Sequence, residues 1–146
     1  MTHQIKRLTA DDIELARSVF AVMATVFGEN AAVVSRDYAA ALLHRDDFLV
    51  VAGLVDGEPI AGLTAFVLPL TRAQTDELFI YDIAVAPAHQ RQGIGRRLVQ
   101  AVRSLAAERN IATTWVPADN EDDPALEFYR AIGGTPHAVT VFTFTH

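Results

Sequence analysis

The sequence contains no cysteine, which excludes several kinds of chemistry before any motif is considered. Without thiols the chain can form no disulfide, bind no metal through thiolates and use no cysteine as a nucleophile. The histidines are scattered, and no two of them have the short spacing that zinc sites use. We therefore expect no metal site. The five histidines are His3, His44, His89, His137 and His146.

Long hydrophobic runs are also missing. The most apolar stretch, residues 19–34, is interrupted by a Gly-Glu-Asn sequence and is too short to cross a bilayer. The first basic residues are followed by acids, whereas a secretory signal would continue with an apolar core. We expect a cytoplasmic protein that does not contact membranes.

Positive charge is scarce, with 12 Lys and Arg against 18 Asp and Glu and a net charge of −6. This balance argues against nucleic acid as a partner and favours a cationic small molecule. The chain has 146 residues, of which 51% are hydrophobic, as in ordinary globular proteins. We predict a single domain over residues 1–146.

Residues 77–98 are the most informative stretch. An apolar run at 78–85, interrupted only by Asp82, predicts a buried strand that Pro87 prevents from continuing. Apolar residues then recur at helical spacing, which predicts an amphipathic helix beginning at about Gly93. Strand, glycine turn and helix in this order build an anion site, because N–H groups at the helix start point outward and glycine lets a phosphate approach.

The rest of the chain predicts alternating strands and helices. Strands are expected at 3–8, 48–55, 60–68, 113–117 and 139–145, with a hairpin turn at Asp56-Gly57. Thr9 and Asp12 have the spacing of a capping box, Ser35 can cap a second helix, and Asp123 can cap a last helix whose first residue is Pro124.

The spacing Gln90-x-x-Gly93-x-Gly95, flanked by arginines, resembles the coenzyme-A-binding signature of the GNAT superfamily of N-acetyltransferases. The element order is similar to that family over nearly the whole chain. The resemblance implies an α+β fold with a mixed central sheet of six to seven strands flanked by about four helices. Residues 65–69, 79–85, 90–94 and 118–125 further resemble the blocks of GNAT-type aminoglycoside 3-N-acetyltransferases, such as gentamicin acetyltransferase.

That resemblance implies acetyl transfer from acetyl-CoA to an aminoglycoside, at the 3-amino group of the deoxystreptamine ring, by direct attack in a ternary complex. It also implies a homodimer formed through the last strand. The family's cofactor site falls on two segments of this chain, the end of the central strand and the glycine turn. Its residues would be Ile83, Ala84, Val85, Gln90, Arg91, Gln92, Gly93, Ile94, Gly95 and Arg96.

Asp82 is the candidate general base, because an acidic residue is rare inside an apolar strand and its presence there indicates a function. Strand alternation predicts that it points to the face opposite Tyr81 and Ile83. Partial burial would have to raise its pKa above the usual value of about 3.9. The alternative is a structural acid that is hydrogen-bonded to a loop.

The loop that carries Glu121, Asp122 and Asp123 is a candidate docking surface for a polycation, although the same acids could simply favour a helix dipole. We assign Glu121 and Asp122 to the substrate, as we do Tyr81, which could equally be a core or cleft-wall residue. Tyr129 occupies the helix in which many GNAT members place a tyrosine near the coenzyme A sulfur, and it is the candidate acid. A core aromatic is the alternative.

Two other functions fit the sequence. One is a GNAT enzyme for another small amine, such as a polyamine or an amino acid. The other is a catalytically inactive module that only binds acetyl-CoA, and the intact acid, acidic loop and tyrosine argue against it.

Overall fold

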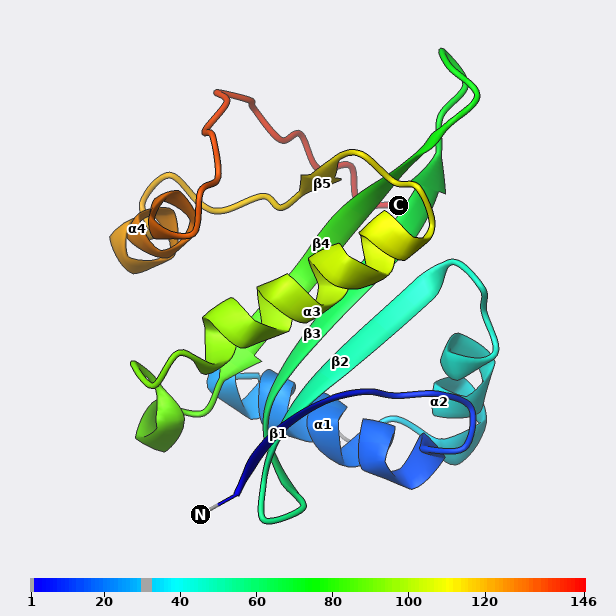
Figure 1. Ribbon diagram of the computed structural model, residues 1–146, viewed down its shortest axis with the longest axis vertical. Helices are drawn as coiled ribbons and strands as arrows, with labels where there is room; N and C mark the ends of the chain where they lie inside the picture. The colour runs from blue at the N-terminus through cyan, green and yellow to red at the C-terminus, as the bar shows by residue number, and fades with distance from the viewer. Residues whose placement is uncertain (1, 30–32) are drawn as a thin grey trace. The chain divides into compact units, whose positions relative to one another are not determined.

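The computed structural model describes residues 2–29 and 33–146 (Figure 1). The described part contains a five-stranded sheet, four α-helices and one short 3-10 helix. In chain order they are β1 (His3–Arg7), α1 (Ile13–Val26), α2 (Arg36–Leu43), β2 (Phe48–Val55), β3 (Glu58–Pro69), β4 (Asp76–Val85), the 3-10 helix (Pro87–His89), α3 (Ile94–Glu108), β5 (Thr114–Trp115) and α4 (Asp123–Ala131).

The sheet is mixed, with the strands in the order β1-β2-β3-β4-β5. The first four strands are antiparallel to their neighbours, whereas β5 pairs with β4 in parallel. All eight residues of β2 are buried, which fits its uninterrupted apolar sequence and requires that both faces of the strand be covered.

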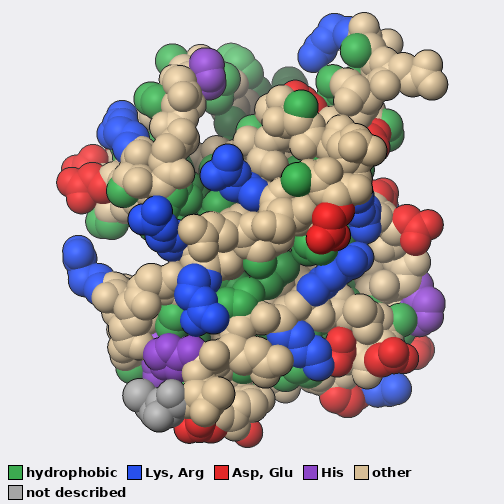
Figure 2. Space-filling model, viewed as in Figure 1, with side chains coloured by type: hydrophobic (Ala, Val, Ile, Leu, Met, Phe, Trp, Pro, Cys, Tyr) green, Lys and Arg blue, Asp and Glu red, His purple; other side chains and the backbone are tan. Residues whose placement is uncertain are grey.

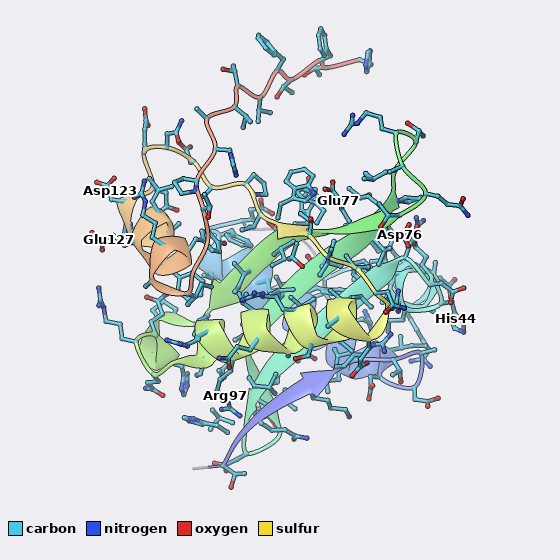
Figure 3. All side chains as sticks on the ribbon, turned by 45° about the horizontal axis from the view of Figure 1, so that its top comes forward. His44, Asp76, Glu77, Arg97, Asp123 and Glu127 are labelled. Atoms are coloured by element: carbon cyan, nitrogen blue, oxygen red, sulfur yellow. The ribbon has the colours of Figure 1, made fainter. Side chains whose placement is uncertain are left out.

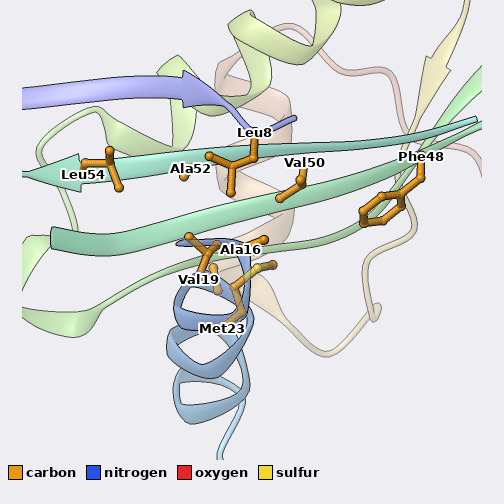
Figure 4. Packing of buried hydrophobic residues seen from close by; sticks show 9 residues of the cluster. Leu8, Ala16, Val19, Met23, Phe48, Val50, Ala52 and Leu54 are labelled. Atoms are coloured by element: carbon orange, nitrogen blue, oxygen red, sulfur yellow. The ribbon is translucent and has the colours of Figure 1, made fainter. Parts of the chain in front are cut away.

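Helices α1 and α3 cover opposite faces of this sheet (Figure 1). Helix α1 lies against β3 at Gly62, where an added Cβ would come within 2.6 Å of both Val19 and Met23. A side chain at Gly62 would therefore push α1 off the sheet. Figure 4 shows the apolar side of α1 facing the side chains of β2. This packing holds α1 in place, and the end of α1 lies at the candidate site.

The chain divides into two compact units, one ending at Val116 and the other spanning Pro117–His146. All five strands belong to the first unit, and the second contains α4. No helix in the described residues is long and apolar enough to cross a membrane.

The predicted α+β class is confirmed, but the predicted six to seven strands are too many for the described residues. The strand predicted at 139–145 does not form within the single chain: the segment pairs with no other strand of the described residues, and its apolar side chains are 72–80% exposed. Alternation of apolar and polar residues shows that a segment could be half-buried in a sheet, but a strand also needs a partner for its backbone.

Two helix starts also differ from prediction. Helix α1 begins at Ile13, so Thr9 is not its cap; instead, the Thr9 N–H donates to the Asp12 carboxylate at 2.9 Å in the turn before the helix. Helix α4 begins at Asp123, one residue earlier than predicted, and Asp122 is its cap. Ser35 caps α2 as predicted, accepting a hydrogen bond from the Tyr38 N–H at 3.1 Å.

Candidate active site

A β-bulge in β4 places Asp82 at the candidate site. Thr64 of β3 pairs with Asp82 and Ala65 pairs with Ile80, so Tyr81 is an extra residue without a partner in the ladder. Such a bulge re-aims side chains and often lies next to active sites. Tyr81 and Asp82 therefore line the same cavity, and the predicted alternation between them is wrong because the strand period is broken at this point.

The cavity lies between the end of α1, α2 and strands β2 to β4, and it has a volume of about 690 Å³. Six of the thirteen described residues that line it are aromatic. The aromatic lining residues are Phe20, Phe27, Tyr38, Phe48, Phe66 and Tyr81. The carboxylates that line it are Glu29 and Asp82, and no Lys, Arg or His is among the lining residues. A mainly apolar cavity with a few convergent polar groups is typical of a small-molecule site.

Burial raises the pKa of the Asp82 carboxyl above its ordinary value, and the negative charge of Glu29 adds to the increase. Within residues 2–29 and 33–116, no hydrogen bond or ion pair to the Asp82 side chain offsets this cost. Burying a carboxylate without a partner is unfavourable, and a ligand that carries a positive charge would remove this cost. The raised pKa also makes Asp82 a stronger base than an exposed aspartate.

The glycine turn forms the start of α3. Gly93 is the N-cap residue, with a left-handed φ of 79°, and no side chain caps the helix. The first N–H groups of α3 are therefore left without a side-chain acceptor, which suits an anion. Arg91, also at positive φ, and Arg96 flank the turn. Figure 2 shows Lys and Arg side chains over the face that α3 covers, and Arg97 points outward from this helix in Figure 3.

The end of β4 leads directly into this turn. Strand β5 pairs with β4 only at Leu78 and Phe79, so within residues 2–116 no strand pairs with that edge of β4 beyond Phe79. This edge includes the predicted cofactor residues Ile83, Ala84 and Val85. The Gln90 side-chain amide donates to the Val85 carbonyl at 2.9 Å, which ties the glycine turn to the strand end.

The second unit carries the remaining candidates. Asp122 accepts the Ala125 N–H at 3.2 Å as the cap of α4, so the cap predicted for Asp123 is wrong by one residue. Asp123 lies in the first helical turn, on the same side of α4 as Glu127 (Figure 3). Glu121 is exposed in the preceding loop. Tyr129 is partly buried, and its ring packs edge-on against Phe128 at a centroid distance of 5.2 Å.

Our sequence reasoning missed Glu29 and the aromatic side chains that α1 and α2 contribute to the cavity. The signal for Glu29 was present, because this acid interrupts the most apolar stretch of the chain, residues 19–34. The aromatic residues read as ordinary helical core positions, and only the packing of the helix ends against β4 distinguishes the cavity wall from the core.

The mixed sheet and the uncapped glycine turn agree with the fold and the anion site that the sequence predicts. A model of the acetyltransferase (GNAT) family matches residues 17–133, and the chain belongs to this family. GNAT enzymes take their acetyl group from acetyl-CoA.

Two curated acetyltransferases are similar to part of this chain. Streptothricin acetyltransferase of Streptomyces lavendulae is 35% identical over 88 residues, which cover 60% of this chain and 44% of that protein. The ribosomal protein bS18-alanine N-acetyltransferase of Escherichia coli K12 is 33% identical over 64 residues, which cover 44% of this chain and 43% of that protein. The chain thus matches less than half the length of these curated relatives.

The similarity to solved structures extends over nearly the whole chain. An aminoglycoside acetyltransferase from an uncultured soil metagenomic sample, solved with trehalose, has a TM-score of 0.94 and 30% identity, covering 99% of this chain and 96% of that one. Its structure in complex with sisomicin has the same TM-score and coverage, with 29% identity.

Proposed function

We propose that the protein transfers the acetyl group of acetyl-CoA to an amine of an aminoglycoside, at the 3-amino group of the deoxystreptamine ring. The observation that carries this proposal is the cavity lined by Asp82 and Glu29, because it presents carboxylates to a ligand and no cationic side chain lines it. A cationic amine is the acceptor that such a cavity favours. The sisomicin-bound structural relative supports the choice of an aminoglycoside.

The donor would be held by the start of α3 and the free edge of β4. The uncapped N–H groups that follow Gly93 fit the pyrophosphate, with Arg91 and Arg96 beside them, and Gln92, Ile94 and Gly95 complete the turn. Acetyl-CoA supplies a thioester carbonyl carbon that an amine can attack. Beyond Phe79, the edge of β4 that faces away from β3 pairs with no strand within residues 2–116, so its backbone is available to align the pantetheine arm.

In the transfer, the acceptor nitrogen bonds to the carbonyl carbon and the carbon–sulfur bond breaks. Asp82 takes the proton from the amine, directly or through water, and Tyr129 gives a proton to the departing thiolate. The raised pKa of Asp82 favours the first step. We assign Glu121 and Asp122 to electrostatic attraction of a polycationic substrate, a role compatible with the cap that Asp122 provides.

The proposal predicts that Asp82→Asn lowers kcat/KM by roughly 10²- to 10⁴-fold, the usual contribution of a general base. The measurement is coenzyme A release, followed with a thiol-reactive dye, from purified protein with acetyl-CoA and sisomicin. Asp76→Asn is the matched control, because it makes the same change at the other end of β4, away from the cavity. Turnover in Asp82→Asn equal to that in the control would contradict the assignment of the base.

Acetylation of another small amine is the second candidate, and the similarity to the bS18-alanine N-acetyltransferase favours it. Spermidine and an alanine-ended peptide, run in the same assay, separate the two proposals. Turnover of one of these amines without turnover of any aminoglycoside would replace the first proposal by the second. Acetyl-CoA binding without turnover of any amine would instead indicate an inactive binding module.

A further inference from the structure

Glu29 is held at the cavity by the way that helix α1 ends. Gly28 adopts a left-handed φ of 74° directly after the helix. Its N–H donates to the Thr25 carbonyl at 3.0 Å, and the Glu29 N–H donates to the Ala24 carbonyl at 2.9 Å. This pair of hydrogen bonds is a Schellman motif, which fixes the backbone of the two residues that follow a helix. The end of α1 therefore fixes the backbone of Glu29 at the cavity.

The charges around the cavity are unbalanced. Glu29 and Asp82 come from different elements, and the other ionisable side chains that line the cavity are Tyr38 and Tyr81. Within residues 2–29 and 33–116, neither carboxylate forms an ion pair. Two like charges at one apolar cavity repel each other, and the repulsion is relieved when a ligand brings positive charge to both.

We propose that Glu29 determines acceptor specificity by holding a second ammonium group of the acceptor while Asp82 receives the reacting amine. The inference rests on the proposed function, because it takes this cavity as the acceptor site. It adds a preference that a single carboxylate would not give: the enzyme selects diamines over monoamines.

The cavity wall indicates what joins the two amines. Phe27 lies at the same helix end as Glu29. Phe66 and Tyr81 line the cavity from strands β3 and β4, and their ring centroids are 6.1 Å apart. Aromatic faces pack against apolar surfaces and attract cations near them. A ring that carries two ammonium groups and presents a hydrocarbon face suits this wall, so the acceptor class is a cyclic diamine.

The experiment compares cis-1,3-diaminocyclohexane with cyclohexylamine, which differ by one amine. Their dissociation constants are measured by titration calorimetry with coenzyme A present, so that no acetyl group is transferred. We expect the wild-type protein to favour the diamine by roughly three- to tenfold, the size of one partly exposed charge contact. In Glu29→Gln, we expect the preference to fall to the statistical advantage of a ligand that offers two equivalent amines.

Glu58→Gln is the control, because it removes the same charge at the exposed β2–β3 hairpin, away from the cavity. The preference should survive in Glu58→Gln and partly return in Glu29→Asp. Far-UV circular dichroism and acetyl-CoA affinity should be equal in all variants. A wild-type protein that does not favour the diamine, or a Glu29→Gln variant that keeps the full preference, would overturn the assignment.

Sisomicin turnover separates this inference from the proposed function. If the diamine preference depends on Glu29 but sisomicin is not acetylated, the aminoglycoside proposal fails and the role of Glu29 stands. If sisomicin is acetylated and Glu29→Gln leaves both the diamine preference and the KM for sisomicin unchanged, the role of Glu29 fails and the aminoglycoside proposal stands.

Discussion

At the scale of single residues, the candidate site contains two carboxylates whose placement lowers the stability of the folded protein. Asp82 is partly buried in β4 without an ion-pair partner in the described part of the first unit, and Glu29 brings a second negative charge to the same cavity. Side chains placed in this way destabilise the protein until a ligand neutralises them. Such a cost is expected where function, and not folding, determines the residue.

This cost can be measured as a pH-dependent stability. The pKa of Asp82 is raised in the folded state, so the folded protein binds this proton more tightly than the unfolded chain does. The free energy of unfolding therefore decreases as pH rises from the ordinary value of 3.8 through the raised pKa. We expect Asp82→Asn to melt at a higher temperature than wild type at pH 7, with the gain shrinking toward pH 4.

Thermal melts from pH 4 to pH 8, followed by circular dichroism, test this prediction. Asp76→Asn, the same substitution outside the cavity, is again the control. An Asp82→Asn protein that is no more stable than wild type at pH 7 would mean that the Asp82 carboxylate has a stabilising partner. The same protonation makes wild-type acetylation weaken as the pH falls through the raised pKa.

At the scale of elements, the sequence predicted several segments that carry a local signal. The apolar run of β2, the Asp56-Gly57 turn and the glycine at the start of α3 are local features, and each lies where it was expected. The bulge at Tyr81 is not local, since it is defined by pairing with Thr64 and Ala65 of another strand. The shared orientation of Tyr81 and Asp82 could therefore not be predicted from alternation within β4.

The turn before α3 gives a prediction that isolates cofactor binding from folding. Gly93 and Gly57 have nearly equal left-handed φ values, 79° and 83°, and an added Cβ would meet no atom within 4 Å at either position. Alanine at either site should cost about 1–2 kcal/mol of folding stability through backbone strain alone. Only Gly93→Ala should also weaken acetyl-CoA binding, by roughly tenfold.

Urea unfolding gives the two stabilities, and calorimetric titration gives the affinity for acetyl-CoA. Comparing the two alanine variants removes the general effect of lost stability. If Gly57→Ala weakened acetyl-CoA binding as much as Gly93→Ala, the glycine turn would have no special role in holding the donor.

At the scale of the whole molecule, the end of the second unit lacks the strand pairing that its sequence pattern predicts within the described residues. Residues 132–146 follow α4 without forming a helix or a strand. Val139, Val141, Phe142 and Phe144 are each at least 72% exposed. Exposed apolar residues of this size, next to one another in a segment that alternates like a strand, are typical of an interaction surface. The sequence pattern predicts that this segment suits a paired strand, but it does not show which strand would pair with it.

We propose that the partner is a second copy of the chain and that segments 139–145 pair across a homodimer. Val141→Pro should then give a monomer, because proline removes a backbone N–H from the paired strand. Val141→Thr should remain a dimer, since threonine keeps that N–H and a β-branched side chain. Sedimentation velocity at micromolar concentration measures both. Loss of the dimer in both variants would show that the Val141 side chain, and not strand pairing, forms the contact, whereas a monomeric wild type would exclude the dimer.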